Sequence, residues 1–225
     1  MAALFTLVSL ALISVSIAEV SQTTSKKESN FTVTDEAWFE VEIKDYEDGD
    51  DLKERFTIAL FGKTCPMTVL NFRKIVEGYK KGKKLLSYKK SPIHRIVPDF
   101  IIQMGDITTG DGTGGESIFG QTFVDENHII SHKAAGYVSM ANHGPDSNGS
   151  QFFITLNKAR WLDGKHVAFG KVINGMDLIR KIGEVPANKN TAVPKKSIKI
   201  IDCGLSSLPK EYDLSEEQSN SDDDI

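Results

Sequence analysis

Polar and aromatic side chains that could act on a ligand are concentrated between residues 93 and 170. They fall in three segments, residues 93–103 (IHRIVPDFIIQ), 139–153 (SMANHGPDSNGSQFF) and 161–170 (WLDGKHVAFG). Arg95 is a lone arginine beside apolar groups. Such a residue usually lies at the surface, with its aliphatic stem packed against the neighbouring apolar side chains. Three such segments in one domain instead indicate a site that combines a guanidinium, side-chain amides and aromatic rings.

Other motifs argue against the commoner kinds of catalytic chemistry. The five histidines show no H-E-x-x-H or similar ligand spacing, and no G-x-S-x-G elbow supplies a serine nucleophile. Residues 110–115 (GDGTGG) satisfy G-x-G-x-x-G, but a dinucleotide site needs a helix to follow, and residues 116–123 lack helical periodicity. We therefore expect no metal, no cofactor and no nucleotide, and a glycine-rich loop where the backbone turns tightly or approaches a ligand.

Short strands are expected to position these segments. The sequence predicts a hairpin from residues 38–43 and 55–61, and further strands at residues 96–102, 136–140, 152–155, 167–172 and 197–202. Helices are predicted at residues 68–77, with Thr64 as the cap and Pro66 in the first turn, and at residues 175–182. Many short strands with two separated helices favour a closed antiparallel barrel.

The strand predicted at residues 96–102 lies within the first of the three segments. Alternation of side chains places Arg95, Ile101 and Gln103 on one face, provided that Pro98 and Asp99 do not reset the register.

The two ends of the chain differ from this core. Residues 1–18 are uncharged and mostly apolar, and they end on a small-x-small cleavage pattern, which predicts a cleaved secretory signal peptide; an uncleaved anchor or a buried strand is the alternative. No later stretch reaches the length of a membrane helix, so no membrane span is expected in the mature chain. Residues 19–35 are predicted to be a flexible Ser/Thr-rich leader with an exposed glycosylation sequon at Asn30, residues 36–207 the domain, and residues 208–225 an acidic disordered tail.

The formal charge of −4 over 225 residues is unevenly distributed. Residues 209–225 carry seven acids and one base, so the remaining chain is slightly basic. The composition, 40% hydrophobic and 26% charged, excludes a wholly disordered chain, and the mild acidity argues against a dedicated nucleic-acid binder.

Residues 78–90 hold six lysines but only two tyrosines for base stacking, which is typical of a solvated loop, with attraction to an acidic protein partner as the alternative. Cys65 and Cys203 match no zinc or redox motif, and whether they pair stays open.

Over residues 39–204 the chain resembles the cyclophilins, the cyclosporin-binding peptidyl-prolyl isomerases, above all in the second and third of the three segments. The resemblance implies a mainly β fold, an eight-stranded antiparallel closed β-barrel capped by two α-helices, with a catalytic groove on its outer face. It implies a monomeric enzyme without a cofactor that acts on X-Pro segments of unfolded or client proteins and binds cyclosporin A. With its signal peptide and lysine-rich loop, the chain is similar to the secretory-pathway branch, in the endoplasmic reticulum lumen or secreted.

The resemblance also implies roles for individual residues. Arg95 matches the residue that stabilises the twisted amide by a hydrogen bond to the prolyl nitrogen. The positions that match the family's catalytic groove are Arg95, Phe100, Gln103, Asn142, Phe153 and His166. The positions that match substrate or cyclosporin contacts are Ile101, Gly112, Ala141, His143, Gln151, Trp161 and Leu162.

Four positions depart from the residues usual in the family. Ile93 stands in place of Phe, Asp99 and Met104 in place of Gly, and His143 in place of a small Ala. Met104 adds bulk that could tilt Gln103, and His143 could narrow the choice of substrate. The expected function is an active isomerase that assists the proline-limited folding of secretory proteins. The alternative is a weakly catalytic proline-binding chaperone or escort for a specific partner.

Overall fold

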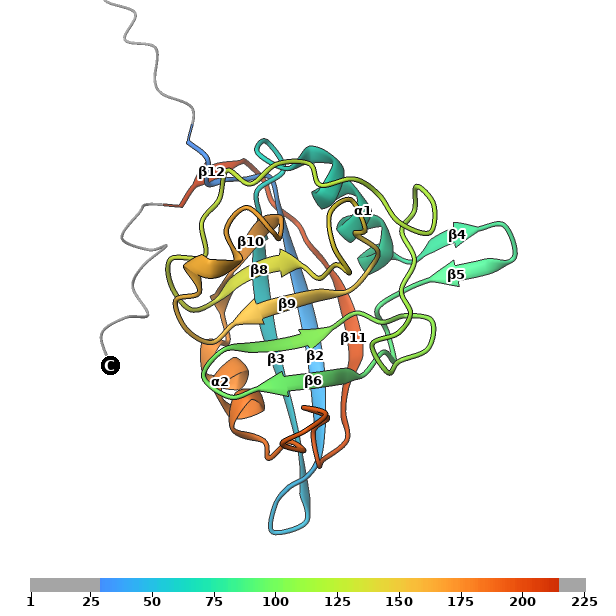
Figure 1. Cartoon of the computed structure of the whole chain (residues 1–225), viewed down its shortest axis with the longest axis vertical. Helices are drawn as coiled ribbons and strands as arrows, with labels where there is room; N and C mark the ends of the chain where they lie inside the picture. The colour runs from blue at the N-terminus through green and yellow to red at the C-terminus, as the bar shows by residue number, and fades with distance from the viewer. Residues whose placement is uncertain (1–28, 215–225) are drawn as a thin grey trace, which may run out of the picture.

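The computed structural model describes residues 29–214, so the predicted signal peptide at residues 1–18 lies outside the described part. Within that part, eight antiparallel strands form one sheet in the order β11-β2-β3-β10-β8-β9-β7-β6 (Figure 1). Their bounds are β2 Asp35–Glu47, β3 Asp50–Leu60, β6 Ile93–Val97, β7 Ile101–Met104, β8 Tyr137–Met140, β9 Phe152–Thr155, β10 Ala168–Asn174 and β11 Ile198–Ser206.

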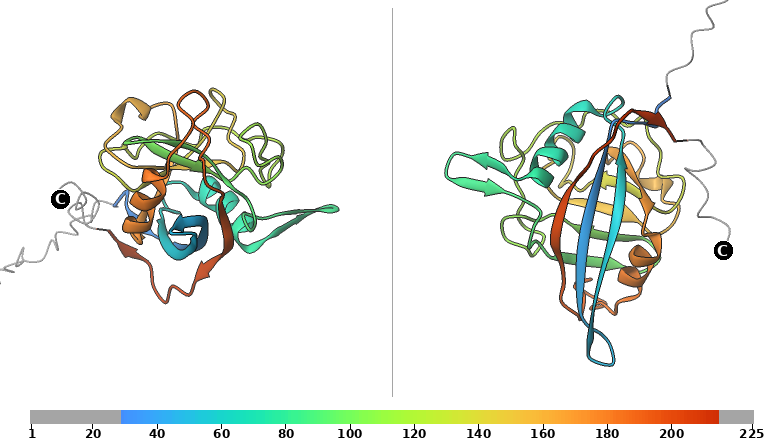
Figure 2. Two further views of the ribbon diagram at one scale, coloured as in Figure 1. Left: turned by 90° about the horizontal axis from the view of Figure 1, so that it is seen from below. Right: turned by 180° about the vertical axis from the view of Figure 1, so that it is seen from behind.

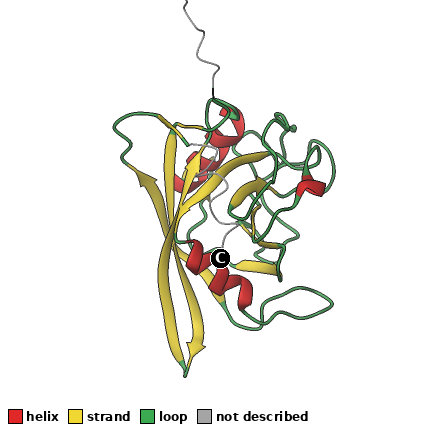
Figure 3. Cartoon of the chain, turned by 90° about the vertical axis from the view of Figure 1, so that its left-hand side faces the viewer, coloured by secondary structure: helices red, strands yellow, loops and turns green. Residues whose placement is uncertain are grey.

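The sheet curls until its first and last strands meet. The amide of Lys90, just before β6, donates to the carbonyl of Ile200 in β11 (2.7 Å), and the amide of Ile200 donates to the carbonyl of Ser91 (3.0 Å). These bonds nearly close the barrel, which the view along its axis in Figure 2 shows. The long β2–β3 ribbon forms one wall and the short strands form the opposite wall (Figure 3). The predicted mainly β barrel with two helices is confirmed.

Two helices cover the barrel, because each has one apolar face. Helix α1 (Pro66–Glu77) buries Val69, Phe72, Ile75 and Val76, and α2 (Met176–Glu184) buries Leu178, Ile179 and Ile182. All of these side chains join the barrel's hydrophobic core. Removing this apolar surface from water contributes about 25 cal/mol per Å² to the stability of the fold.

The start of α1 differs from the prediction. Pro66 does occupy the first turn, but Thr64 does not cap the helix; its hydroxyl donates to the carbonyl of Asn30 (2.8 Å). The first-turn amides of Met67 and Thr68, which have no partner within the helix, instead donate to the Glu126 carboxylate of a distant loop, at 2.8 Å each. A carboxylate at this position also suits the positive end of the helix dipole.

The single strand predicted at residues 96–102 is wrong, because the chain turns within it. Asp99 adopts φ of +58° between β6 and β7, and the two strands pair antiparallel as a hairpin. Cross-strand pairing of Arg95 with Gln103, and of Val97 with Ile101, places the predicted residues on one face after all.

The ordered part of the chain extends beyond the predicted domain boundaries. Strand β1 (Thr32–Val33) lies in the predicted flexible leader, and it pairs with β12 (Tyr212–Asp213) in the predicted disordered tail. Val33 is fully buried and Leu214 is 8% exposed, so short apolar residues anchor both segments to a small core cluster around Phe61. The leader and the tail are therefore ordered where they meet each other.

Residues 78–90 are not simply a loop. Strands β4 (Tyr79–Lys81) and β5 (Lys84–Leu86) form a separate two-stranded sheet, which stands out from the barrel in Figures 1 and 2. Elsewhere a short 3-10 helix, Arg160–Leu162, carries Trp161. Among residues 29–214, no helix has the length and apolar character needed to cross a membrane.

The two cysteines are free and buried. Cys65 lies at the start of α1, where its thiol contacts the carbonyl of Ala168. The Cys203 thiol instead contacts the carbonyl of Val76, near the end of α1. A helix of this length separates its ends by roughly 15 Å, well beyond the reach of a disulfide. Burial raises the pKa of both thiols to about 12.

Candidate active site

A row of outward-facing side chains crosses the short-stranded wall of the barrel. Arg95 on β6 lies opposite Gln103 on β7, which lies opposite Phe153 on β9. The neighbouring row, Ile96, Ile102 and Ile154, is fully buried and faces the core. Alternation along each strand therefore sends the functional candidates to the outer face while the isoleucines hold the strands to the core.

A β-bulge at His94 sets the direction of Arg95. Ile93 pairs with Met104, and Arg95 pairs with Gln103. Two steps along β6 therefore correspond to a single step along β7. Ile93 can therefore point into the core while Arg95 points outward, which an unbroken strand would not allow. The extra residue, His94, is only 7% exposed.

Three polar side chains and two backbone carbonyls form a hydrogen-bonded chain that begins at Arg95. Its Nη1 donates to Gln103 Oε1 (3.3 Å), and Gln103 Nε2 donates to Gln151 Oε1 (2.9 Å). Gln151 Nε2 in turn donates to the carbonyls of Gly112 (3.0 Å) and Gly114 (2.8 Å). The chain fixes the orientation of both glutamine amides and leaves the remaining donors of the Arg95 guanidinium available.

An apolar cluster lies beside this chain on the same face. Ile101, Phe153 and Leu162 are buried in a small cluster of their own, separate from the main core, and Phe100 packs against them. The Phe100 ring also lies against Trp161, with centroids 5.4 Å apart, and Trp161 itself is 61% exposed. A cluster of this kind suits a compact apolar ring placed beside a cation.

Two histidines flank Phe153. His166 meets its ring edge to face at 5.2 Å, and the His166 Nδ1–H donates to the carbonyl of Met140 (3.0 Å). His132 stacks behind Phe153 at 6.0 Å, and its Nδ1 bonds to Asp163 Oδ1 (2.8 Å). Burial lowers the pKa of both histidines below the ordinary value, against the opposing effect of these hydrogen bonds, and so favours the neutral form of each ring.

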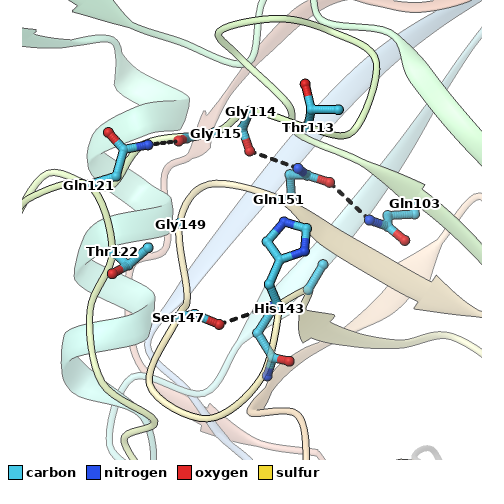
Figure 4. Close-up of a pocket in the computed structure, with 12 residues that line it drawn as sticks. Gln103, Thr113, Gly114, Gly115, Gln121, Thr122, His143, Ser147, Gly149 and Gln151 are labelled. Carbon is cyan, nitrogen blue, oxygen red and sulfur yellow. Dashed lines mark hydrogen bonds between the residues drawn. The ribbon is translucent and has the colours of Figure 1, made fainter.

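A pocket of about 100 Å³ adjoins the polar chain (Figure 4). The His143 imidazole points into it toward Gln151 (Figure 4), and Ala141 and Asn142 also line the pocket. The Asn142 side chain donates to the carbonyl of Lys165 (2.8 Å) and so ties two of the three sequence segments together. The lining residues that sequence reasoning missed are Thr113, Gly114, Gly115, Gln121, Thr122, Ser147 and Gly149.

Asp106, which sequence reasoning also missed, organises the glycine-rich loop. Its carboxylate is 1% exposed and accepts hydrogen bonds from the backbone amides of Thr108 (3.1 Å), Thr109 (3.0 Å), Gly112 (2.9 Å) and Gly114 (3.0 Å). Burial alone would raise the pKa of Asp106, but the hydrogen bonds outweigh it and hold the pKa well below its ordinary range. An aspartate followed two and three residues later by Thr-Thr is the only local signal for this turn.

The predicted site residues thus come together on one face of the barrel. The Gly112 carbonyl accepts a hydrogen bond from Gln151. A glycine is needed at this position because φ is +92° and the backbone passes close to the His94 ring. The expected effect of Met104 on Gln103 is not seen, because Met104 is fully buried on the opposite face. Among residues 29–214, no group of three His, Cys, Asp or Glu side chains is arranged to hold a metal ion.

Comparison with known proteins agrees with this geometry. The profile of the family described as "Cyclophilin type peptidyl-prolyl cis-trans isomerase/CLD" matches residues 39–205. The chain is 49% identical over 183 residues to peptidyl-prolyl cis-trans isomerase CYP21-1 of Arabidopsis thaliana, covering 80% of this chain and 78% of that protein. It is 47% identical over 163 residues to peptidyl-prolyl cis-trans isomerase B of Saccharomyces cerevisiae, covering 71% and 77%. The chain therefore belongs to the cyclophilin family and is a peptidyl-prolyl cis-trans isomerase.

Proposed function

We propose that Arg95 is the catalytic residue and that the apolar cluster of Phe100, Ile101, Phe153 and Leu162 holds the substrate's proline ring. The observation that carries this proposal is the shared outer row, in which the Arg95 guanidinium, the Gln103 amide and the Phe153 ring lie on adjacent strands. Gln103 and the backbone near Asn142 hold the substrate carbonyls, with His166 at the cluster's edge.

The reaction needs a positioned donor rather than a nucleophile. Rotation about the X-Pro bond breaks amide resonance, at a cost of about 18–20 kcal/mol for an ordinary peptide bond. In the twisted amide the prolyl nitrogen becomes pyramidal and basic, so it accepts a hydrogen bond from Arg95 that neither planar form accepts. Only interactions that strengthen in the transition state raise the rate. Gln103 limits the motion of the guanidinium, so little reorganisation is required.

A protease-coupled assay on an Ala-Pro-Phe peptide tests this assignment. Arg95→Ala should lower kcat/KM about a hundredfold, the usual effect of removing one donor that stabilises a transition state. Arg180→Ala is the matched control, because Arg180 is an exposed arginine on α2 whose one ion pair in the described part of the chain is with Asp177. An unchanged kcat/KM in Arg95→Ala would overturn the catalytic role. A wild-type protein that binds the peptide without isomerising it would favour a proline-binding escort.

We also propose that the same groove binds cyclosporin A through Trp161. The exposed Trp161 lies on Phe100, whereas the other tryptophan, Trp38, lies under the Arg55 guanidinium at 4.0 Å on β2. Cyclosporin should therefore change the fluorescence of Trp161 alone and raise the melting temperature. Trp161→Phe should abolish the fluorescence change; a change that persists in this variant would contradict the contact.

The cellular role that we propose is the assistance of proline-limited folding in the secretory pathway, either in the endoplasmic reticulum lumen or after secretion. The apolar residues 1–18 and the exposed sequon residue Asn30 support it. The second sequon residue, Asn148, is fully buried and donates to Asp125 (2.7 Å), which leaves no room for a glycan. Glycosidase treatment of the secreted or lumenal protein should shift its mobility, and Asn30→Gln should remove that shift. An unglycosylated chain, or a shift that survives Asn30→Gln, would count against this role.

A further inference from the structure

The hairpin of β4 and β5, residues 79–86, extends away from the barrel (Figures 1 and 2). We call it the lysine hairpin, because four of its eight residues are lysines. An isolated two-stranded ribbon is marginally stable in water, and like charges directly opposite each other weaken it further. Lys81 and Lys84 are such a pair.

The lysines on the inner face of the lysine hairpin are paired with the barrel's loops. Cross-strand partners share a face, so Lys81, Lys84 and the buried Leu86 lie on the same side. Glu116 bridges both lysines, at 2.9 Å from Lys81 and 3.0 Å from Lys84. Lys81 also donates to the carbonyls of Ser117 (2.9 Å) and Gly120 (3.0 Å). These bonds fix the hairpin in place against the barrel.

The outer face has no such partners. Lys80 and Leu85 pair across the strands on this side, and Lys83 lies at the turn. Lys80 and Lys83 are exposed and make no ion pair with any of residues 29–214, and Leu85 is 64% exposed. Lys90 at the base is likewise exposed and unpaired within that part. Within residues 29–214, the six lysines of residues 79–90 thus form ion pairs with two acids, Glu116 and Asp202.

We propose that this outer face, made by Lys80, Lys83 and Leu85, docks an acidic polypeptide segment that carries an apolar side chain. The uncompensated lysines complement a run of carboxylates, and Leu85 offers an apolar contact between them. Single-stranded nucleic acid fits less well, since bases stack on aromatic rings. Tyr88 is fully buried, and Tyr79 pairs with Leu86 on the inner face. Docking leaves the isomerase groove open, so a bound partner would hold nearby proline segments at a raised local concentration.

Fluorescence anisotropy with a labelled Asp/Glu peptide, containing one central Phe and no proline, tests the proposal. The double variant Lys80→Glu/Lys83→Glu should weaken binding about tenfold or more and reduce its salt dependence. The control, Lys189→Glu/Lys195→Glu, makes the same change of charge on exposed residues of a distant loop and should bind like wild type. Leu85→Ser should weaken the Phe peptide but not the same peptide with Ala at that position.

Three results would overturn the proposal. They are absence of binding, equal weakening by both double variants, and tighter binding of a charge-matched single-stranded DNA that does not respond to Leu85→Ser. Activity on the Ala-Pro-Phe peptide serves as the folding control, because the substituted residues are exposed and lie outside the groove. The proposal does not depend on the role of Arg95, and Arg95→Ala should leave peptide docking unchanged.

Discussion

Replacement of Asp106 by Asn tests whether the glycine-rich loop positions the active site. The change keeps the size of the side chain and removes one acceptor oxygen. Oδ1 accepts the amides of Thr108 and Thr109, and Oδ2 accepts those of Gly112 and Gly114. In either orientation of the new amide, its NH₂ group faces two backbone N–H donors that have lost their acceptor.

The structure sets the size of the effect. Each buried donor left without a partner costs about 1–3 kcal/mol, so two give roughly 2–6 kcal/mol. Thr108 and Thr109 lie at the exposed surface, where water can replace the lost acceptor, and this favours the lower end, about 2 kcal/mol. Gly112 and Gly114 supply the carbonyls that hold Gln151, and through it Gln103 and Arg95. Because small misplacements of reacting groups are costly, we expect kcat/KM to fall about tenfold, mainly through kcat.

Urea denaturation and the protease-coupled assay measure the two effects. Asp111→Asn is the control, since Asp111 lies exposed in the same loop and bonds only to Thr109 and Thr113. It should change the free energy of unfolding by no more than about 0.5 kcal/mol and leave kcat/KM unchanged. Loss of stability in Asp106→Asn with full activity would refute the link from the loop to Arg95. An unchanged free energy of unfolding would refute the expectation that Asp106→Asn leaves two backbone N–H donors without an acceptor.

Three further predictions follow from burial and backbone geometry. Gly112→Ala should cost about 1–3 kcal/mol in urea denaturation and lower activity, because its φ is +92° and the new Cβ would lie 2.8 Å from the buried His94 ring. Thiol alkylation should label Cys65 and Cys203 only after unfolding, and mild oxidation of the folded protein should form no intramolecular disulfide, as mass spectrometry would detect. The pKa of His132 is lowered by burial, so the unfolded state takes up its proton more readily. Stability should therefore fall as the pH drops through about 6.5, the ordinary value for histidine, and His132→Gln should reduce this fall.

The sequence predicted those parts of the fold that rest on local patterns. The hairpin of β2 and β3, strand β9 and the apolar face of α2 follow from alternation and helical periodicity within each segment. The turn at Asp99 was not predicted, although Pro98 and Asp99 were noted as residues that could reset the register, because this dipeptide does not by itself distinguish a chain reversal from a kink within one strand. The pairing of β1 with β12 joins residues 180 positions apart, and no local pattern encodes such a contact.

The site was predicted less completely than the fold. Arg95, Phe153 and Trp161 stand in recognisable segments, so their resemblance to a known family located them. Asp106 acts through backbone amides, and its importance depends on loop geometry that its sequence neighbours do not specify. The cap of α1 by Glu126 was missed for the same reason, since the two are brought together only by the folded barrel.

Two departures from the family's usual residues, Ile93 for Phe and Met104 for Gly, are coupled in this structure. The two residues face each other across β6 and β7, and both are buried in the core. Compared with the family's usual residues, the larger side chain of Met104 thus accompanies the smaller side chain of Ile93. Met104→Gly should cost about 3–5 kcal/mol, because it opens a cavity and adds a flexible residue to a strand, and Ile93→Phe should cost about 1–3 kcal/mol through overpacking. In the double variant the Phe ring can fill the space that Met104 leaves, so the combined loss in urea denaturation should fall short of the sum by about 1 kcal/mol or more. Additivity within about 0.5 kcal/mol would mean that the two departures are independent.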